Sequence, residues 1–94
     1  MLTSEQIRAA RAMLRIEQAN LAALAGVSLE TIKRIERRPG RISALAATLD
    51  AIRAALEAAG VEFIAENGGG AGVRLRKAQP AAIPVGDLNA SNDE

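Results

Sequence analysis

The chain has 94 residues, of which 49% are hydrophobic and 1% aromatic, so it can form one small domain around an aliphatic core. It has no cysteine and no histidine, which excludes disulfides, thiolate metal sites and the usual general base. We therefore expect no metal, no cofactor and no enzymatic activity. The formal net charge is +1 and no segment has the length of a membrane span, which favours a cytoplasmic protein without a membrane partner.

The first predicted helix lies close to the N-terminus. Thr3 and Gln6 have the spacing of a capping box, so this helix should begin near Ser4 and end near Arg15. Its expected inward-facing residues are Ile7, Ala10, Met13 and Leu14.

Two short helices are predicted on either side of Gly26, over residues 18–25 and 29–37. Glycine suits the left-handed backbone at a helix end, and Ser28 suits the N-cap of the next helix. The inward-facing residues should be Leu21, Ala22, Leu24 and Ala25 before the turn, Val27 in it, and Ile32 and Ile35 after it. Two short helices joined by a glycine-containing turn form a helix-turn-helix, the alternative being an ordinary helical hairpin in a bundle.

The second helix of this pair should leave a basic face exposed. Helical spacing places Leu29, Glu30, Lys33, Arg34 and Arg37 outward. A further pair of cations, Arg38 and Arg41, follows the helix. Such a cluster suits phosphate binding, although charge alone also fits a solvated helix face.

A longer helix and a hairpin complete the expected fold. Ser43 is the predicted N-cap of a fourth helix that ends near Ala59, unless the break after Arg41 produces two short helices. Its stripe would be Leu45, Leu49, Ile52 and Leu56. Strands over 61–64 and 73–76 should flank the "GGGAG" loop, the alternative being a flexible linker. The expected organisation is a helical domain (1–59), a β-hairpin (60–77) and a disordered tail (78–94).

The stretch "IRAARAMLRIEQANLAALAGVSLETIKRIERR" resembles the phage-repressor-like (Cro/XRE-type) helix-turn-helix family, over roughly Leu2 to Ala59. The resemblance implies a mainly α, lambda-repressor-like bundle of four or five helices, to which this chain would add a C-terminal β-hairpin. It also implies that the third helix enters the DNA major groove. By position, the implied DNA contacts are Gln18 to a phosphate and Ser28, Leu29, Glu30, Lys33 and Arg34 at the recognition helix. The resemblance further implies an ion pair between Arg11 and Glu36.

Physical chemistry assigns separate tasks to these side chains. Arg34 can read guanine bidentately, Lys33 can reach a base or a phosphate, and Leu29 can touch a thymine methyl. Glu30 can accept from cytosine or merely repel phosphates. The phosphate candidates that follow are Arg37, Arg38 and Arg41.

The resulting hypothesis is a transcriptional regulator, a repressor that binds operator DNA as a homodimer. The alternative is a protein-interaction module, an antitoxin or antiactivator with the same fold and another regulatory protein as its partner. The dimerisation candidates lie in the hairpin: Val61, Phe63, Val73 and Leu75. Pairing of two hairpins would bury Phe63, whereas the alternative folds the hairpin back on the fourth helix.

Overall fold

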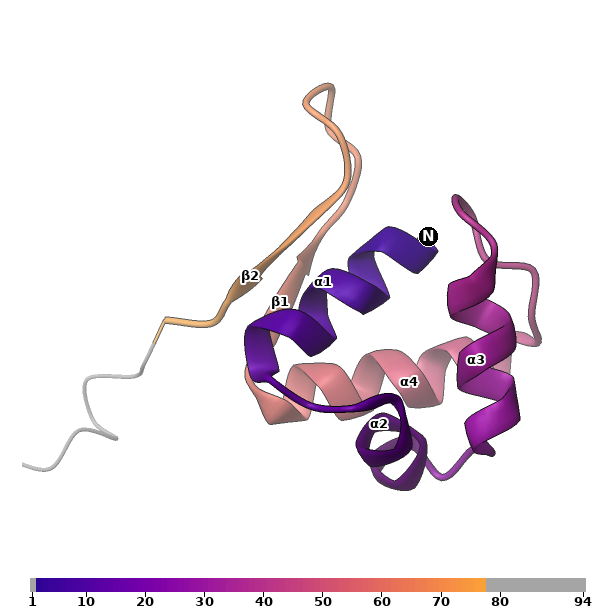
Figure 1. Ribbon diagram of the computed structural model, residues 1–94. Helices are drawn as coiled ribbons and strands as arrows, with labels where there is room; N and C mark the ends of the chain where they lie inside the picture. Colours follow the sequence, from indigo (N-terminus) through magenta and orange to yellow (C-terminus); the bar gives the residue numbers. More distant parts are fainter. Residues whose placement is uncertain (1, 78–94) are drawn as a thin grey trace, which may run out of the picture.

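The computed structural model describes residues 2–77, in which four helices precede one two-stranded antiparallel sheet. The elements are α1 (Ser4–Leu14), α2 (Gln18–Ala25), α3 (Leu29–Arg37), α4 (Ala46–Ala59), β1 (Val61–Ile64) and β2 (Gly72–Leu75). Helix α3 and the hairpin lie at opposite ends of the molecule, with α1 and α4 between them (Figure 1). The prediction of a mainly α domain followed by a β-hairpin is confirmed, and the expected disordered tail lies outside the described residues.

Helix α1 begins with the predicted capping box. The Thr3 hydroxyl accepts the Gln6 backbone N–H at 3.1 Å, and the Gln6 side-chain oxygen accepts the Thr3 N–H at 2.9 Å. The Gln6 amide nitrogen also donates to the carbonyls of Ile64 and Gly72, at 3.3 and 2.8 Å. One side chain therefore caps α1 and holds the hairpin against it. Arg15 ends the helix in the left-handed region, with φ at 58°.

The core draws on all four helices and on β1. Its buried hydrophobic residues are Leu2, Ile7, Ala10, Leu21, Ala22, Ile32, Ile35, Ile52, Leu56 and Val61. Three residues that were expected to face inward are instead exposed: Met13 by 40%, Leu24 by 59% and Leu45 by 77%. Apolar residues surround most of α2, so spacing alone does not identify its buried side. Leu45 precedes α4, so it does not share the inward face of that helix as expected.

The prediction that Ser43 caps α4 is wrong. The helix begins at Ala46, and Leu45 occupies the N-cap position without a side-chain hydrogen bond. The physical reason is packing distant in sequence: Arg41 forms an isolated antiparallel bridge with Thr3, and Ile42 and Ala44 then pack against the core. Because these two residues alternate with the exposed Ser43 and Leu45, the chain stays extended up to the start of α4.

The hairpin folds back onto its own domain. Val61 pairs with Leu75 and Phe63 with Val73, so these four side chains share one face of the ribbon. Val61 is fully buried in the core, Phe63 and Val73 pack partly against it, and Leu75 is 57% exposed. Strand β2 starts at Gly72, one residue before its predicted start. The hairpin thus packs on α1 and α4 of its own chain, as the alternative describes, and the dimerisation role of these four residues stays a prediction.

Candidate nucleic-acid interface

The turn between α2 and α3 depends on a glycine backbone. Gly26 has φ at 71°, a value that L-residues with a side chain rarely adopt, while a Cβ added there would meet nothing within 4 Å. The requirement at this position is therefore conformational and not steric. Immediately after the turn, the Ser28 hydroxyl accepts the Thr31 backbone N–H at 3.1 Å and so begins α3, as predicted.

Helix α3 has one face in the core and one in solvent. Ile32 is fully buried and Ile35 is 5% exposed, as the helical spacing predicts. Leu29 was expected to face outward, but it is only partly exposed and packs against the core. Leu29 lies three and seven residues before the buried Ile32 and Glu36, so helical spacing places it on the inward side of α3.

An ion pair links the inward side of α3 to α1. Arg11 donates to both carboxylate oxygens of Glu36 at 2.7 Å, and the Glu36 side chain is only 4% exposed. The hydrogen-bonded carboxylate raises the pKa of Arg11. The Gln18 amide also donates to Glu36, at 3.1 Å, so this candidate phosphate contact is engaged inside the protein. Arg11 neutralises Glu36, which leaves the charge of the α3 outer face positive.

A second set of contacts holds the turn after α3. The Glu5 carboxylate accepts the Gly40 N–H at 3.0 and 3.3 Å, and the Gly40 carbonyl accepts the Ser4 N–H at 2.9 Å. Hydrogen bonds from the Glu5 backbone and from Gly40 lower the pKa of the Glu5 carboxyl. The sequence did not predict this role for Glu5, whose only local signal is a carboxylate in the first turn of a helix. These bonds position the flanking Arg38 and Arg41.

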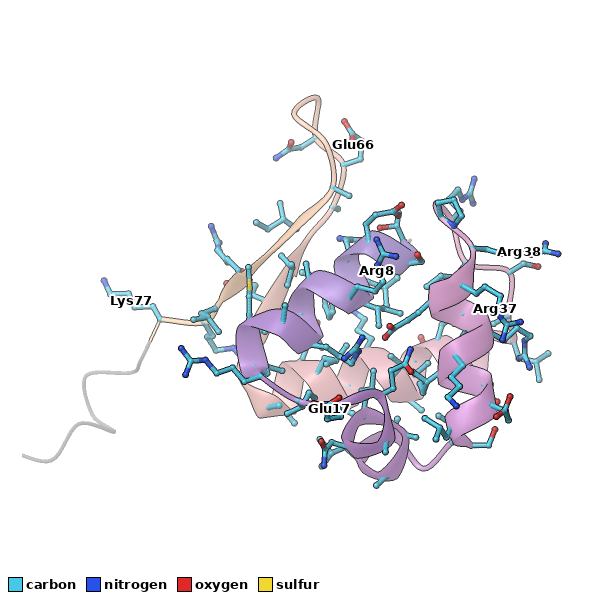
Figure 2. The ribbon with its side chains drawn as sticks, viewed as in Figure 1. Arg8, Glu17, Arg37, Arg38, Glu66 and Lys77 are labelled. Atoms are coloured by element: carbon cyan, nitrogen blue, oxygen red, sulfur yellow. The ribbon has the colours of Figure 1, made fainter. Side chains whose placement is uncertain are left out.

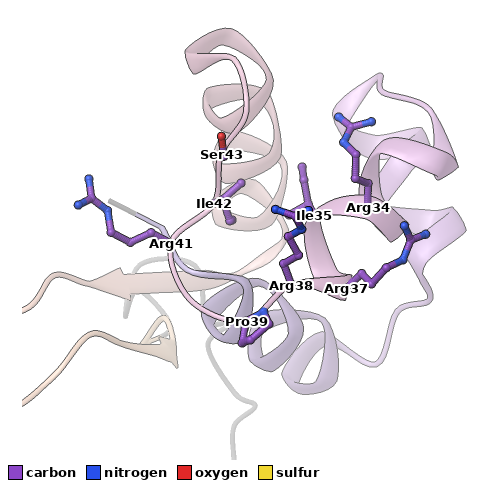
Figure 3. A pocket seen from close by; sticks show the side chains of 8 residues that line it. All are labelled: Arg34, Ile35, Arg37, Arg38, Pro39, Arg41, Ile42 and Ser43. Carbon is purple, nitrogen blue, oxygen red and sulfur yellow. The ribbon is translucent and has the colours of Figure 1, made fainter.

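A basic hollow of about 580 Å³ lies between the end of α3 and the following loop. In Figure 3 the side chains of Arg34, Arg37 and Arg38 extend from α3, and the Arg41 side chain extends from the loop in the direction away from α3. The lining residues are Arg34, Ile35, Arg37, Arg38, Pro39, Arg41, Ile42 and Ser43. Several guanidinium groups around a concave surface form a suitable site for phosphate oxygens.

The cations of this region are not neutralised within the part of the chain that the structure describes. Lys33, Arg34, Arg37, Arg38 and Arg41 are all exposed, and none of them lies within 4 Å of a carboxylate oxygen of residues 2–77. Arg37 and Arg38 extend from α3 on the side away from α1 and the hairpin (Figure 2). Apart from Gln18, the polar DNA-binding candidates are exposed on α3 and its flanking segments, and we call residues 28, 30, 33, 34, 37, 38 and 41 together the α3 surface.

Comparison with protein-family models and with curated proteins finds no match to this chain. The longest helix within residues 2–77, α4, has 14 residues, and none there is long and apolar enough to cross a bilayer, for which about 20 are needed.

Proposed function

We propose that the chain is a sequence-specific DNA-binding transcriptional regulator with a lambda-repressor-like helix-turn-helix, and that α3 enters the major groove. The observation that carries this proposal is the division of α3: Ile32 and Ile35 anchor the helix in the core, and its outer face presents cations without partners among residues 2–77. A helix held in this way can present side chains to base edges without disturbing the core.

The α3 surface divides into base-reading and phosphate-binding parts. Lys33 and Arg34 lie on the exposed middle of the helix, where they can reach base edges. Arg37, Arg38 and Arg41 surround the hollow at its end, and a DNA backbone that passes there would place phosphates among several guanidinium groups.

The proposed protein acts in the cytoplasm as a homodimeric repressor and binds its operator without catalysing a reaction. Two α3 helices about 34 Å apart would meet successive major grooves on one side of the duplex. The protein-interaction alternative depended on the near-neutral net charge and on an exposed Leu29, and it has less support because Leu29 packs against the core.

Selection of bound sequences from random DNA, followed by titration of the selected site at several salt concentrations, tests the proposal. We expect a single preferred motif and a strong salt dependence. Replacing Arg37, Arg38 and Arg41 by Gln should lower the slope of log K against log salt by about 0.9 for each phosphate that the variant no longer neutralises. A wild-type chain without salt-sensitive DNA binding contradicts the proposal.

A further inference from the structure

An exposed leucine lies beside an apolar hollow at the start of α4. Leu45 is 77% exposed and directly precedes Ala46, the first residue of the helix. The hollow has a volume of about 240 Å³, and its lining residues are Leu2, Ile42, Ala46, Leu49, Asp50 and Arg53. We call Leu45 and these six residues the α4 patch.

The hollow is small for a ligand site but suitable for a protein side chain. Small-molecule pockets usually have volumes of about 300–1,000 Å³, so this one falls below the range. A single patch thus presents an apolar projection, Leu45, and an apolar depression next to it. In a two-fold symmetric contact the same patch meets itself, so a projection beside a depression is self-complementary.

The charges at the rim of the α4 patch fit the same arrangement. Asp50 is exposed, and no cation of residues 2–77 lies within 4 Å of its carboxylate. The Arg53 side chain is 48% exposed and donates to Glu57 at 3.1 Å. Since Asp50 and Arg53 both line the hollow, each copy in a two-fold contact can offer both signs of charge to the other.

The other exposed apolar side chains are less suitable. Met13, Leu24 and Leu75 are all less exposed than Leu45, and none of them is next in sequence to a residue that lines the apolar hollow, as Leu45 is. The apolar face of the hairpin, where the sequence placed the dimerisation candidates, already covers this chain's own core through Val61.

We propose that the α4 patch binds a second copy of this chain, with Leu45 of each copy in the hollow of the other. The inference deepens the proposed DNA-binding function by assigning its dimer interface, and only the DNA measurements below rest on that function. Ile42 lines both the apolar and the basic hollow, so a contact on the α4 patch brings the two basic hollows close to the two-fold axis. The α4 patch is small, so a weak dimer that buries less than about 1,200 Å² is expected.

Sedimentation of the full chain over a concentration series, with Leu45→Ser as the main variant, tests the interface. Serine is a favourable N-cap residue, so the substitution should maintain or raise thermal stability while it removes the projection. Because the substitution removes one leucine from each copy of a two-fold contact, the dissociation constant of the dimer should rise about 100-fold. The matched control is Leu24→Ser, which removes another exposed leucine and should dimerise as wild type does. A second variant, Ala46→Glu, places a carboxylate in the hollow at a position where a helix start tolerates it, and should also abolish the dimer.

DNA measurements separate this inference from the proposed function. Leu45→Ser should bind a single half-site as tightly as wild type does but lack cooperative binding to paired half-sites. A chain that dimerises through Leu45 and binds no DNA contradicts the proposed function and supports the interface. A wild-type chain that is monomeric at millimolar concentration overturns the interface, as does a Leu45→Ser chain that dimerises normally or a dimer that requires residues 78–94 instead of Leu45.

Discussion

The outer face of α3 and the outer face of the hairpin both carry arginines, but only those of the hairpin are engaged within the described part of the chain. Arg74 donates two hydrogen bonds of 3.2 Å to Glu62 on the neighbouring strand, and Arg76 donates to the Val61 carbonyl at 3.1 Å. The cations of the α3 surface have no carboxylate partner among residues 2–77. An arginine that already has a partner within the fold therefore stabilises the hairpin. An arginine without such a partner remains available to a polyanion such as DNA.

The prediction with the largest expected effect compares the ion pair between Arg11 and Glu36 of α3 with the ion pair of the hairpin. Arg11→Met should destabilise the fold by about 3 kcal/mol, because it leaves the nearly buried Glu36 without its cation. Arg74→Met should have little effect, since the Glu62 carboxylate that it leaves is exposed to water. Urea unfolding of both variants measures the difference.

A double-mutant cycle provides the control for this comparison. Replacing Arg11 and Glu36 together by Met should restore part of the stability that Arg11→Met removes, because no unpaired charge remains in the core. A coupling free energy near zero would show that the buried pair behaves as two independent charges.

The second prediction compares the two regions in DNA binding. Arg34→Ala should cost about 1–3 kcal/mol on the preferred site and relax specificity at one base pair. The matched change on the other face, Arg74→Ala, should leave the affinity unchanged. Fluorescence anisotropy with the selected site and its single-base variants measures both effects, and equal decreases in affinity for the two substitutions would count against the α3 surface.

The third prediction compares a glycine from each region. Gly26→Ala should destabilise the fold by about 1 kcal/mol, because an L-residue is strained at a φ of 71°. Gly72→Ala should be close to neutral, since its φ is not left-handed and an added Cβ would make ordinary contacts with Ile64 at 3.8 and 3.9 Å. Thermal unfolding of the two variants distinguishes them; a neutral Gly26→Ala would remove the conformational argument for the turn.

The smallest expected effect is the pH response of the hairpin pair. The hydrogen bond from Arg74 lowers the pKa of Glu62 below its ordinary value of 4.5, so the carboxylate stabilises the folded state above that pH. This contribution decreases as the pH falls from 4.5 through the lower folded-state pKa. Carboxyl NMR titration should show a Glu62 midpoint below 4.5 that rises in Arg74→Ala, and an unchanged midpoint would contradict the pairing.

Features whose partners are near in sequence were predictable from the sequence. Thr3 and Gln6 are three residues apart, and their reciprocal bonds form the predicted cap. The left-handed turn at Gly26 and the cap at Ser28 likewise depend on neighbouring residues alone. The bounds of α2 and α3 follow from these signals, and with them the identity of most residues on the α3 surface.

Features that depend on partners distant in sequence were decided only by the tertiary structure. The start of α4 at Ala46 follows from the packing of Ile42 and Ala44 against the core, which no local pattern reveals. The Gln18 amide has its partner in Glu36, on another helix. Hydrophobic spacing identifies residues that can be buried, but burial itself requires a neighbouring element to cover them. Val61 has such cover and Leu45 does not, because the packing of α1, α4 and the hairpin encloses one and leaves the other in solvent.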